Sequence, residues 1–431
     1  MLVPRPLNCV LAAPYRNRIP LMSSGGVQDG GNLTDFISLG SLTRVFRREL
    51  VEEIIAESGR REQRSRLLPA HLVVYYVLAL ALFFGEGYDE VMRKLVGGLR
   101  FFKNWDRRWH VPSTSAISQA RARLGEAPLK ELFERVATPM AQRSTRGAWL
   151  RDRRVMAIDA VVLDMPDTPA NNGEYAHYDT GRGRGAFPAV RIVALAECGT
   201  RAIVDAAIGS CDIGERQLAE GVLRSLTADM VLLADRGYYS YELWGAAGQS
   251  GAALAFRVGA NMNFAVLEQY PDGSYRSVLL PPRKQSPVRK LAARRNDLSV
   301  LEAAGTPCRV VEYTVDNREN PGEVIRLITT ILDWAQAPAH ELATIYHERW
   351  EIELGFREIE VHQVGHSRVL RSKSPEMVRQ EIWGILLAHY AIRKMMVEAA
   401  DYADVDPDRA SFLRSLQIIR RHITGQADFS P

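Results

Sequence analysis

The spacing of apolar residues changes near Arg154, and this change limits the folds that are open to the chain. Between Leu39 and Gly147, apolar residues recur at helical spacing, in segments separated by short Gly or Pro breaks. From Arg154 to Val258 they form short runs rich in β-branched residues, interrupted by two helical segments. Three strands followed by helix, strand, helix and strand predict a mixed sheet with helices packed on it. We therefore expect an α/β (α+β mixed) fold behind a helical N-terminal domain.

The expected elements can be assigned to residues. Helices are predicted in the first region at 48–58, 69–84, 88–95, 115–124 and 129–143. The sheet region should have strands at 155–163, 190–197, 202–208, 231–234 and 253–258, with helices at 215–226 and 241–247. The apolar run Leu72–Phe84 has 13 residues, fewer than the roughly 20 of a membrane span, so it predicts a buried helix. A largely apolar helix at 381–397 is expected to pack against the sheet.

An insertion is predicted between the last strand of the sheet and the segment that begins near residue 338. Two hairpins are expected there, one around Pro271-Asp272-Gly273 and one around Asn320-Pro321-Gly322. Between them, a segment without any acidic residue carries Arg283, Lys284, Arg289, Lys290, Arg294 and Arg295. We interpret this segment as a loop that phosphates could order; a flexible solvated loop is the alternative.

Three short motifs contain the residues best suited to chemistry. Asp159 ends the apolar run Val155–Ile158, and Asp235 ends the run Val231–Ala234. Residues 346–360 contain no Pro and only one Gly, which predicts a helix. On that helix one face would carry the polar residues Tyr346, Arg349, Glu353, Arg357 and Glu360. An ordinary helix face, on which Arg349 pairs with Glu353, is the structural alternative. Trp350 is expected in the core.

The order Tyr-x-x-Arg-x-x-x-Glu, after two Asp residues that each end an apolar run, resembles the signature of bacterial DDE transposases of the insertion-sequence-four family. The resemblance extends from about residue 38 to residue 423. It implies an RNase H-like catalytic core with a β-rich insertion, in which Asp159, Asp235 and Glu353 are the catalytic residues. Two departures stand out. Glu360 replaces the family's Lys, and Ala160-Val161 replaces the usual Gly-Thr.

The chemistry implied by the resemblance is phosphodiester cleavage with metal ions. Two Mg²⁺ ions, for which Mn²⁺ can substitute, would activate the attacking oxygen and stabilise the leaving oxygen. Asp159, Asp235 and Glu353 would bind them, because Mg²⁺ prefers hard oxygen ligands. Glu360 should repel DNA, so either Arg357 replaces the family's Lys or this copy is catalytically impaired. No zinc site is expected at His362 and His366, because Gly365 between them disfavours a helix.

Residues expected to bind DNA lie in several segments. The segment 112–123 begins with cap residues and ends with basic ones, so it could enter a major groove or be an ordinary surface helix. The full set expected to contact DNA is Gln119, Arg121, Arg123, Lys284, Arg289, Lys290, Arg294, Arg295, Tyr346, Arg349, Arg357, Arg371 and Lys373. The net charge is only +4, from 55 basic and 51 acidic residues, so a DNA-binding surface must be local.

These observations give one expected organisation. A disordered leader (1–34) precedes a helical DNA-binding domain (35–150), and the catalytic core (151–258 and 338–400) is split by the insertion (259–337) before a basic C-terminal helix and tail (401–431). The four cysteines are widely spaced, as in a cytoplasmic protein with reduced thiols. The resemblance implies a transposase that binds terminal inverted repeats and target DNA, cleaves and transfers strands, and works as a homodimer. A hairpin intermediate, a nuclease without transposition and an inactive DNA-binding relic stay open.

Overall fold

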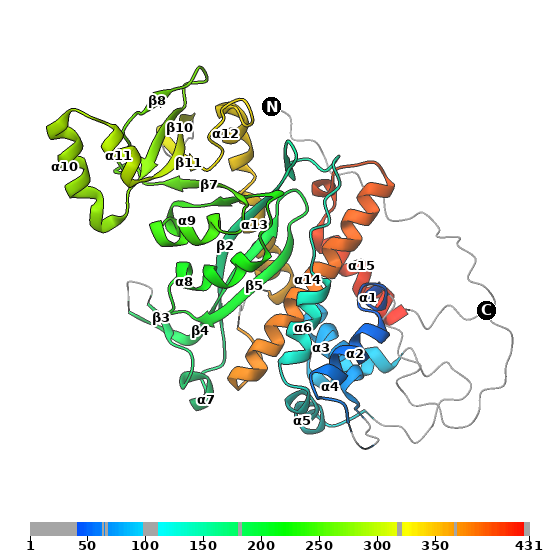
Figure 1. Ribbon diagram of the computed structural model, residues 1–431. Coiled ribbons are helices and arrows are strands. Elements are labelled where there is room, and N and C mark those ends of the chain that lie inside the picture. The colour runs from blue at the N-terminus through cyan, green and yellow to red at the C-terminus, as the bar shows by residue number, and fades with distance from the viewer. Residues whose placement is uncertain are drawn as a thin grey trace. The chain divides into compact units, whose positions relative to one another are not determined.

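The computed structural model describes residues 41–62, 64, 68–97, 111–179, 183–316, 321–365 and 369–425 (Figure 1). The predicted leader (1–34) lies outside these residues. The chain divides into two compact units. We call Met1–Thr138, Met165–Asn171 and Arg357–Pro431 the helical unit, and Pro139–Asp164 and Asn172–Phe356 the sheet unit. No helix in the described ranges combines the length and the apolar character needed to cross a membrane.

The helical unit is built around two helices with many buried residues, α3 and α14. Its elements are α1 (Ser41–Val45), α2 (Arg48–Glu57), α3 (Ala70–Leu82), α4 (Tyr88–Gly97), α5 (Thr114–Leu124), α6 (Ala127–Val136), η6 (Glu358–Val364, a π-helix), α14 (Pro375–Tyr402), η7 (Pro407–Arg409) and α15 (Phe412–Gly425). Every residue of α3 except His71 is buried, which confirms the predicted buried helix. The short α7 covers Pro169–Asn172.

Two expectations about these helices were wrong. The helix predicted to reach Arg143 ends at Val136, because Pro139 disfavours helical backbone in the residue before it and provides no N–H for a helix. The second error concerns α14, which was expected on the sheet but packs mainly on α3 and α6. A Cβ on Gly384 of α14 would lie 2.7 Å from Cγ1 of Val77 in α3, so the close approach of these helices requires glycine.

The sheet unit contains the predicted mixed sheet. Its first elements are β1 (Trp149–Leu150), β2 (Arg153–Asp164), β3 (His177–Asp179), β4 (Arg184–Glu197), β5 (Ala202–Ser210), α8 (Glu215–Ala219), η3 (Glu220–Ser225), β6 (Met230–Ala234), η4 (Arg236–Tyr238), α9 (Tyr241–Gly248) and β7 (Ala253–Val258). The strand β4 pairs antiparallel with β2 and β5, whereas β6 runs parallel to β2 and β7. The order β5-β4-β2-β6-β7 is that of an RNase H-like core, which confirms the predicted fold class.

The insertion lengthens the same sheet beyond β7. Its strands are β8 (Glu268–Gln269), β9 (Tyr275–Leu279), β10 (Thr306–Asp316) and β11 (Pro321–Thr329), and β11 pairs with β7. Both predicted hairpin pairings are present, β8 with β9 and β10 with β11. Arg309 anchors the first turn: it is fully buried, and its Nη2 donates to Oδ2 of Asp272 over 2.7 Å. The unit continues into α12 (Ala339–His347) and α13 (Trp350–Arg357).

The basic segment of the insertion is helical, so its interpretation as a loop was wrong. It forms η5 (Pro282–Lys284) and α10 (Gln285–Arg295), followed by α11 (Ser299–Ala304). Val288 and Ala292, one turn apart, pack against the cluster of Val278, Leu280 and Leu301, and this burial gives the helix a side to fold against. Asn296 ends α10 in the left-handed conformation, with φ of 48°. Figure 1 shows α10 and α11 beside the strands of the insertion.

Candidate active site

The register of two parallel strands brings the first two carboxylates together. Ile158 of β2 pairs with Ala234 of β6, and β6 ends there. The next residues are Asp159 and Asp235, which therefore lie side by side where β6 ends. Neighbouring residues of parallel strands project to the same face of a sheet. Asp159 is placed by the pairing of β2 with β4, Asp235 directly follows the last paired residue of β6, and both are half-buried.

The third carboxylate comes from the segment α12–α13. The side chain of Tyr346 in α12 is buried, and its hydroxyl donates to the carbonyl oxygen of Ala234 over 3.3 Å. This contact holds α12 against the end of β6. The chain then tightens at Glu348 and Arg349, whose N–H groups bond three rather than four residues back. The predicted single helix with one polar stripe was therefore wrong, since α12 ends at His347 and α13 begins at Trp350.

Arg349 links the first and third carboxylates. Its Nη1 donates to Oδ2 of Asp159 over 3.2 Å, and its Nη2 donates to Oε1 of Glu353 over 2.7 Å. The predicted pairing of Arg349 with Glu353 is thus present, and the same guanidinium also reaches Asp159. Only 7% of Arg349 is exposed. Tyr346 and Arg349 are both buried and bond inside the site, and their expected contact with phosphates stays a prediction.

Trp350 was expected in the core, and this was wrong. The side chain follows Arg349 directly and is 53% exposed. The guanidinium carbon of Arg349 lies 5.4 Å from the centre of its ring. Leu354, one turn further along α13, is also exposed. The helix therefore presents an apolar surface beside Glu353, and the helical pattern of the sequence did not distinguish this side from the buried one.

Asp159 carries the clearest electrostatic signal of the site. Burial raises its pKa to about 6, and the charges of Glu353 and Glu215 add to the rise. Two effects oppose it: the hydrogen bond from the Ala160 N–H and the charge of Arg349. Tyr238 in η4 lies near the same carboxylate: burial raises its pKa, and the charge of Asp159 adds to the effect. Its hydroxyl is buried and has no hydrogen-bond partner in the part of the chain that the structure describes. The three carboxylates of the site therefore carry more negative charge than the single guanidinium of Arg349 can neutralise.

One basic residue near the site was missed by the sequence analysis. Ala234 of β6 pairs with Ile158 of β2 and with Phe256 of β7. The next residues along the three strands, Asp159, Asp235 and Arg257, therefore lie next to one another, with Asp235 in the middle. Arg257 is half-buried and forms an ion pair with Glu323 of β11. Burial raises the pKa of Tyr346, and the charges of Arg349 and Arg257 oppose this rise. The parallel pairing of the strands 231–234 and 253–258 would have revealed this position. Asp159, Asp235 and Arg257 form one row across the sheet.

Two residues of the predicted DNA-binding set form hydrogen bonds within the helical unit. Arg121 is 3% exposed, and its Nε donates to Oε1 of Gln380 over 2.9 Å. Arg371 donates to the carbonyl oxygens of Leu80 and Glu86 over 2.8 and 3.0 Å. Both guanidinium groups are engaged in intramolecular bonds, and their expected contact with DNA stays a prediction.

The other residues of that set are accessible. In the helical unit, the exposed ones are Gln119, Arg123, Arg357 and Lys373. In the sheet unit, the exposed ones are Lys284, Arg289, Lys290, Arg294 and Arg295. Glu360 is half-buried and lies in the π-helix η6, so seven residues after Glu353 do not correspond to two α-helical turns. The spacing that suggested a shared face for Glu353 and Glu360 therefore does not apply.

The donor set suits a hard divalent cation in its chemistry. Asp159, Asp235 and Glu353 provide carboxylate oxygens, the ligands that Mg²⁺ prefers. A cationic group, Arg349, already contacts two of the three. Within the described residues, no group of three or more His, Cys, Asp or Glu side chains is arranged to hold a metal ion as it stands. A metal would therefore share these carboxylates with the guanidinium of Arg349.

Comparisons with known proteins show the family of the chain. Residues 36–134 match the family model "Insertion element 4 transposase N-terminal", and residues 150–391, more than half of the chain, match "Transposase DDE domain". The chain is 29% identical over 388 residues to "Transposase InsG for insertion sequence element IS4" of Escherichia coli (strain K12), covering 89% of this chain and 82% of the relative. A solved structure, "Cryo-EM structure of piggyBac transposase synaptic complex with hairpin DNA (SNHP)", has a TM-score of 0.45 and 11% identity, covering 91% and 82% of the two chains. The chain belongs to the insertion-sequence-four family of DDE transposases.

Proposed function

We propose that the chain is an insertion-sequence transposase that binds terminal inverted repeats, cleaves the DNA there and joins the freed 3′-hydroxyl to target DNA. The observation that carries the proposal is that Asp159 and Asp235 lie side by side at the end of β6, while Arg349 joins Glu353 to Asp159. The pKa of Asp159, which burial raises to about 6, adds support, because perturbed pKa values cluster at functional sites.

The carboxylates would bind two Mg²⁺ ions, with Mn²⁺ able to substitute, and the ions would supply a Lewis acid for each oxygen of the in-line displacement. Asp159 lies on β2 and Asp235 follows the end of β6, so both would hold the ions against the sheet. Glu353 is held by Arg349, which keeps the carboxylate near Asp159 while the protein is free of DNA. Tyr346 positions the segment that contains both residues by its bond to the end of β6. Arg257 lies beside Asp235, where it could neutralise a phosphate of the bound strand.

The test uses duplexes that end in the inverted repeats found beside the gene. With Mg²⁺, the wild-type protein should nick these ends and transfer them to a plasmid. Asp159→Asn, Asp235→Asn and Glu353→Gln should each abolish cleavage while end binding is retained, because the size of the side chains is kept. A carboxylate variant that still cuts would remove that residue from the site.

Two rival functions give different results in the same assay. Cleavage of end DNA and unrelated DNA alike, without joined products, would indicate an RNase H-like nuclease that does not transpose. Binding of the ends without cleavage at any Mg²⁺ or Mn²⁺ concentration would indicate an impaired relic. A homodimer that pairs two ends, in the cytoplasm, is part of the proposal. Light scattering of the complex with DNA should give two chains for two ends.

We also propose that α10 contacts DNA phosphates. Its packed side contains Val288 and Ala292, and Lys290 and Arg294 lie on the opposite side of the helix. Both side chains are exposed, and neither forms an ion pair among the described residues. Gln119, Arg123, Arg357 and Lys373, exposed on the helical unit, are proposed as further contacts. Because each phosphate contact releases counterions, losing two contacts should lower the slope of log K against log salt by about 2.

The double variant Lys290→Gln/Arg294→Gln tests this contact. Its affinity should fall equally for end DNA and for unrelated duplex, with a shallower salt dependence. The matched control is Arg44→Gln/Arg48→Gln, which removes the same charge from exposed residues that pair with Glu398 and Glu52. If both double variants behave alike, α10 does not contact DNA.

A further inference from the structure

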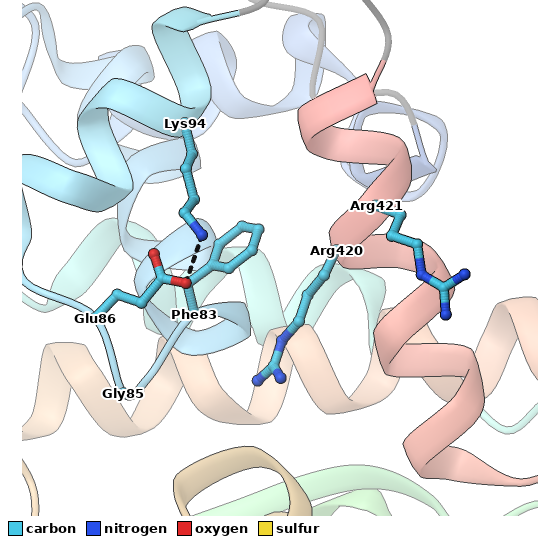
Figure 2. Close-up of a pocket in the computed structure, with 6 residues that line it drawn as sticks. All are labelled: Phe83, Gly85, Glu86, Lys94, Arg420 and Arg421. Carbon is cyan, nitrogen blue, oxygen red and sulfur yellow. Dashed lines mark hydrogen bonds and ion pairs between the residues drawn. The ribbon is translucent and has the colours of Figure 1, made fainter.

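A pocket of about 430 Å³ lies in the helical unit, in a part of the fold that the carboxylate chemistry does not use. Figure 2 shows the residues that line it. They are Phe83, Gly85, Glu86, Lys94, Arg420 and Arg421. The first three belong to the turn between α3 and α4, Lys94 lies on α4, and the two arginines lie near the end of α15. The pocket thus combines segments from opposite ends of the sequence, and it exists only when α15 is docked.

The lining is strongly basic. It contains three basic side chains and one acidic side chain. Nζ of Lys94 lies 2.6 Å from Oε1 of Glu86 and 5.1 Å from the centre of the Phe83 ring. Glu86 also acts on Arg420 by its charge. Two of the three basic side chains of the lining, Arg420 and Arg421, come from α15.

The two arginines differ in how they are held. Nε of Arg420 donates to the carbonyl oxygen of Leu82 over 2.5 Å, and its guanidinium carbon lies 6.0 Å from the Phe83 ring. This bond aims the guanidinium into the pocket, where Figure 2 shows it pointing from α15 toward the turn. Burial lowers the pKa of Arg420, and the charge of Glu86 opposes this effect. Arg421 is exposed at the rim.

Resting on the DNA-binding function proposed above, we propose that this pocket binds a phosphate group of the DNA backbone. Guanidinium groups present several N–H donors in a fixed plane that matches phosphate oxygens, and an ammonium group beside them adds charge. The volume is many times the roughly 30 Å³ of a water molecule, so a phosphodiester has room to enter. The contact would be independent of base sequence, because only the backbone is bound.

The test compares four full-length single variants. Arg421→Gln should weaken binding to end DNA and to unrelated duplex by the same factor, about three- to tenfold, and lower the salt slope by about 1. Arg420→Gln should act in the same direction. Glu86→Gln removes the one acidic group of the pocket and should tighten binding, an effect opposite to that of a purely structural defect. Arg414→Gln, exposed on the same helix outside the lining, is the matched control and should leave affinity nearly unchanged.

Each outcome decides a separate question. If Arg421→Gln and Glu86→Gln behave like Arg414→Gln while the wild-type protein binds DNA, the pocket is not a DNA contact and the proposed function stands. Inorganic phosphate is the second probe. If it raises the melting temperature of the wild-type protein but not of Arg420→Gln, and no variant changes DNA affinity, the pocket takes free phosphate only and the inference fails. A wild-type protein that binds no duplex overturns both the proposed function and this contact.

Discussion

Asp159→Asn should stabilise the protein free of metal, even though it should destroy the activity. In an unfolded chain this carboxyl has a pKa near 3.8, and in the folded site burial raises the pKa to about 6. Between these values the unfolded state loses its proton first, so stability falls as the pH rises, and above pH 6 the loss is complete. The difference amounts to about 3 kcal/mol, because a tenfold change in affinity for the proton corresponds to 1.36 kcal/mol. Asparagine has nearly the same shape and does not ionise.

Calorimetry at pH 4.5 and at pH 8, in buffer with a chelator, would measure the effect. At pH 8 the variant should melt about 3 °C above the wild-type protein, because about 3 kcal/mol is divided by an unfolding entropy of about 0.9 kcal/mol/K for 431 residues. At pH 4.5 about two thirds of the difference should be gone. The control is Asp205→Asn, which removes a buried carboxylate that accepts bonds from Arg224 and Ser225. That variant should melt lower at pH 8. If Asp159→Asn also melts lower at pH 8, or gains equally at both pH values, the carboxylate is not poorly compensated and the electrostatic account of the site is refuted.

Three further variants test other parts of the structure. Tyr238→Phe removes a buried hydroxyl that has no hydrogen-bond partner among the described residues. The free energy of unfolding should stay the same or rise by about 1 kcal/mol, and a decrease of about 1 kcal/mol would mean that the hydroxyl is hydrogen-bonded. Arg349→Gln should lower the melting temperature at pH 8 in chelator, and Mg²⁺ should then stabilise the variant more than the wild-type protein; equal Mg²⁺ effects would exclude competition between the metal and the guanidinium. Arg309→Met leaves Asp272 without its buried partner and should cost about 3–5 kcal/mol, with faster amide exchange in β9 and β10, whereas Arg48→Met at an exposed pair should cost under about 1 kcal/mol.

The sheet could be predicted from the sequence because its strands are buried and therefore appear as short apolar runs rich in β-branched residues. The five core strands are present near their expected positions, and the two Asp residues lie next to each other because both follow strands that pair in parallel. That Asp159 and Asp235 are neighbours therefore follows from local pattern plus topology. The hairpins of the insertion were predictable from turn residues such as Pro271-Asp272-Gly273.

Predictions failed where helical residues had two possible environments. Trp350 and Arg121 both occur in helical sequences, and only tertiary packing decides that the first is exposed and the second is buried. A helix through Glu348 and Arg349 was the natural expectation, because neither Pro nor Gly marks the break. The basic run of α10 lacks a strong apolar stripe. Its helix depends on two small contacts, by Val288 and Ala292, with a cluster that the sequence does not place beside it.

The pairing of β11 with β7 has a consequence for any attempt to reduce this protein to its catalytic minimum. Without the insertion, β7 would be the last strand on its side of the sheet, and the backbone groups of Ala255–Val258 that now pair with β11 would face solvent. An unpaired, apolar strand of this kind is a template for association with other chains. In the intact sheet the terminal strand is instead β8, which has two residues, both exposed. The insertion therefore also acts as a cap against aggregation, and a shortened protein would need a substitute, such as a charged residue on β7, to stay monodisperse.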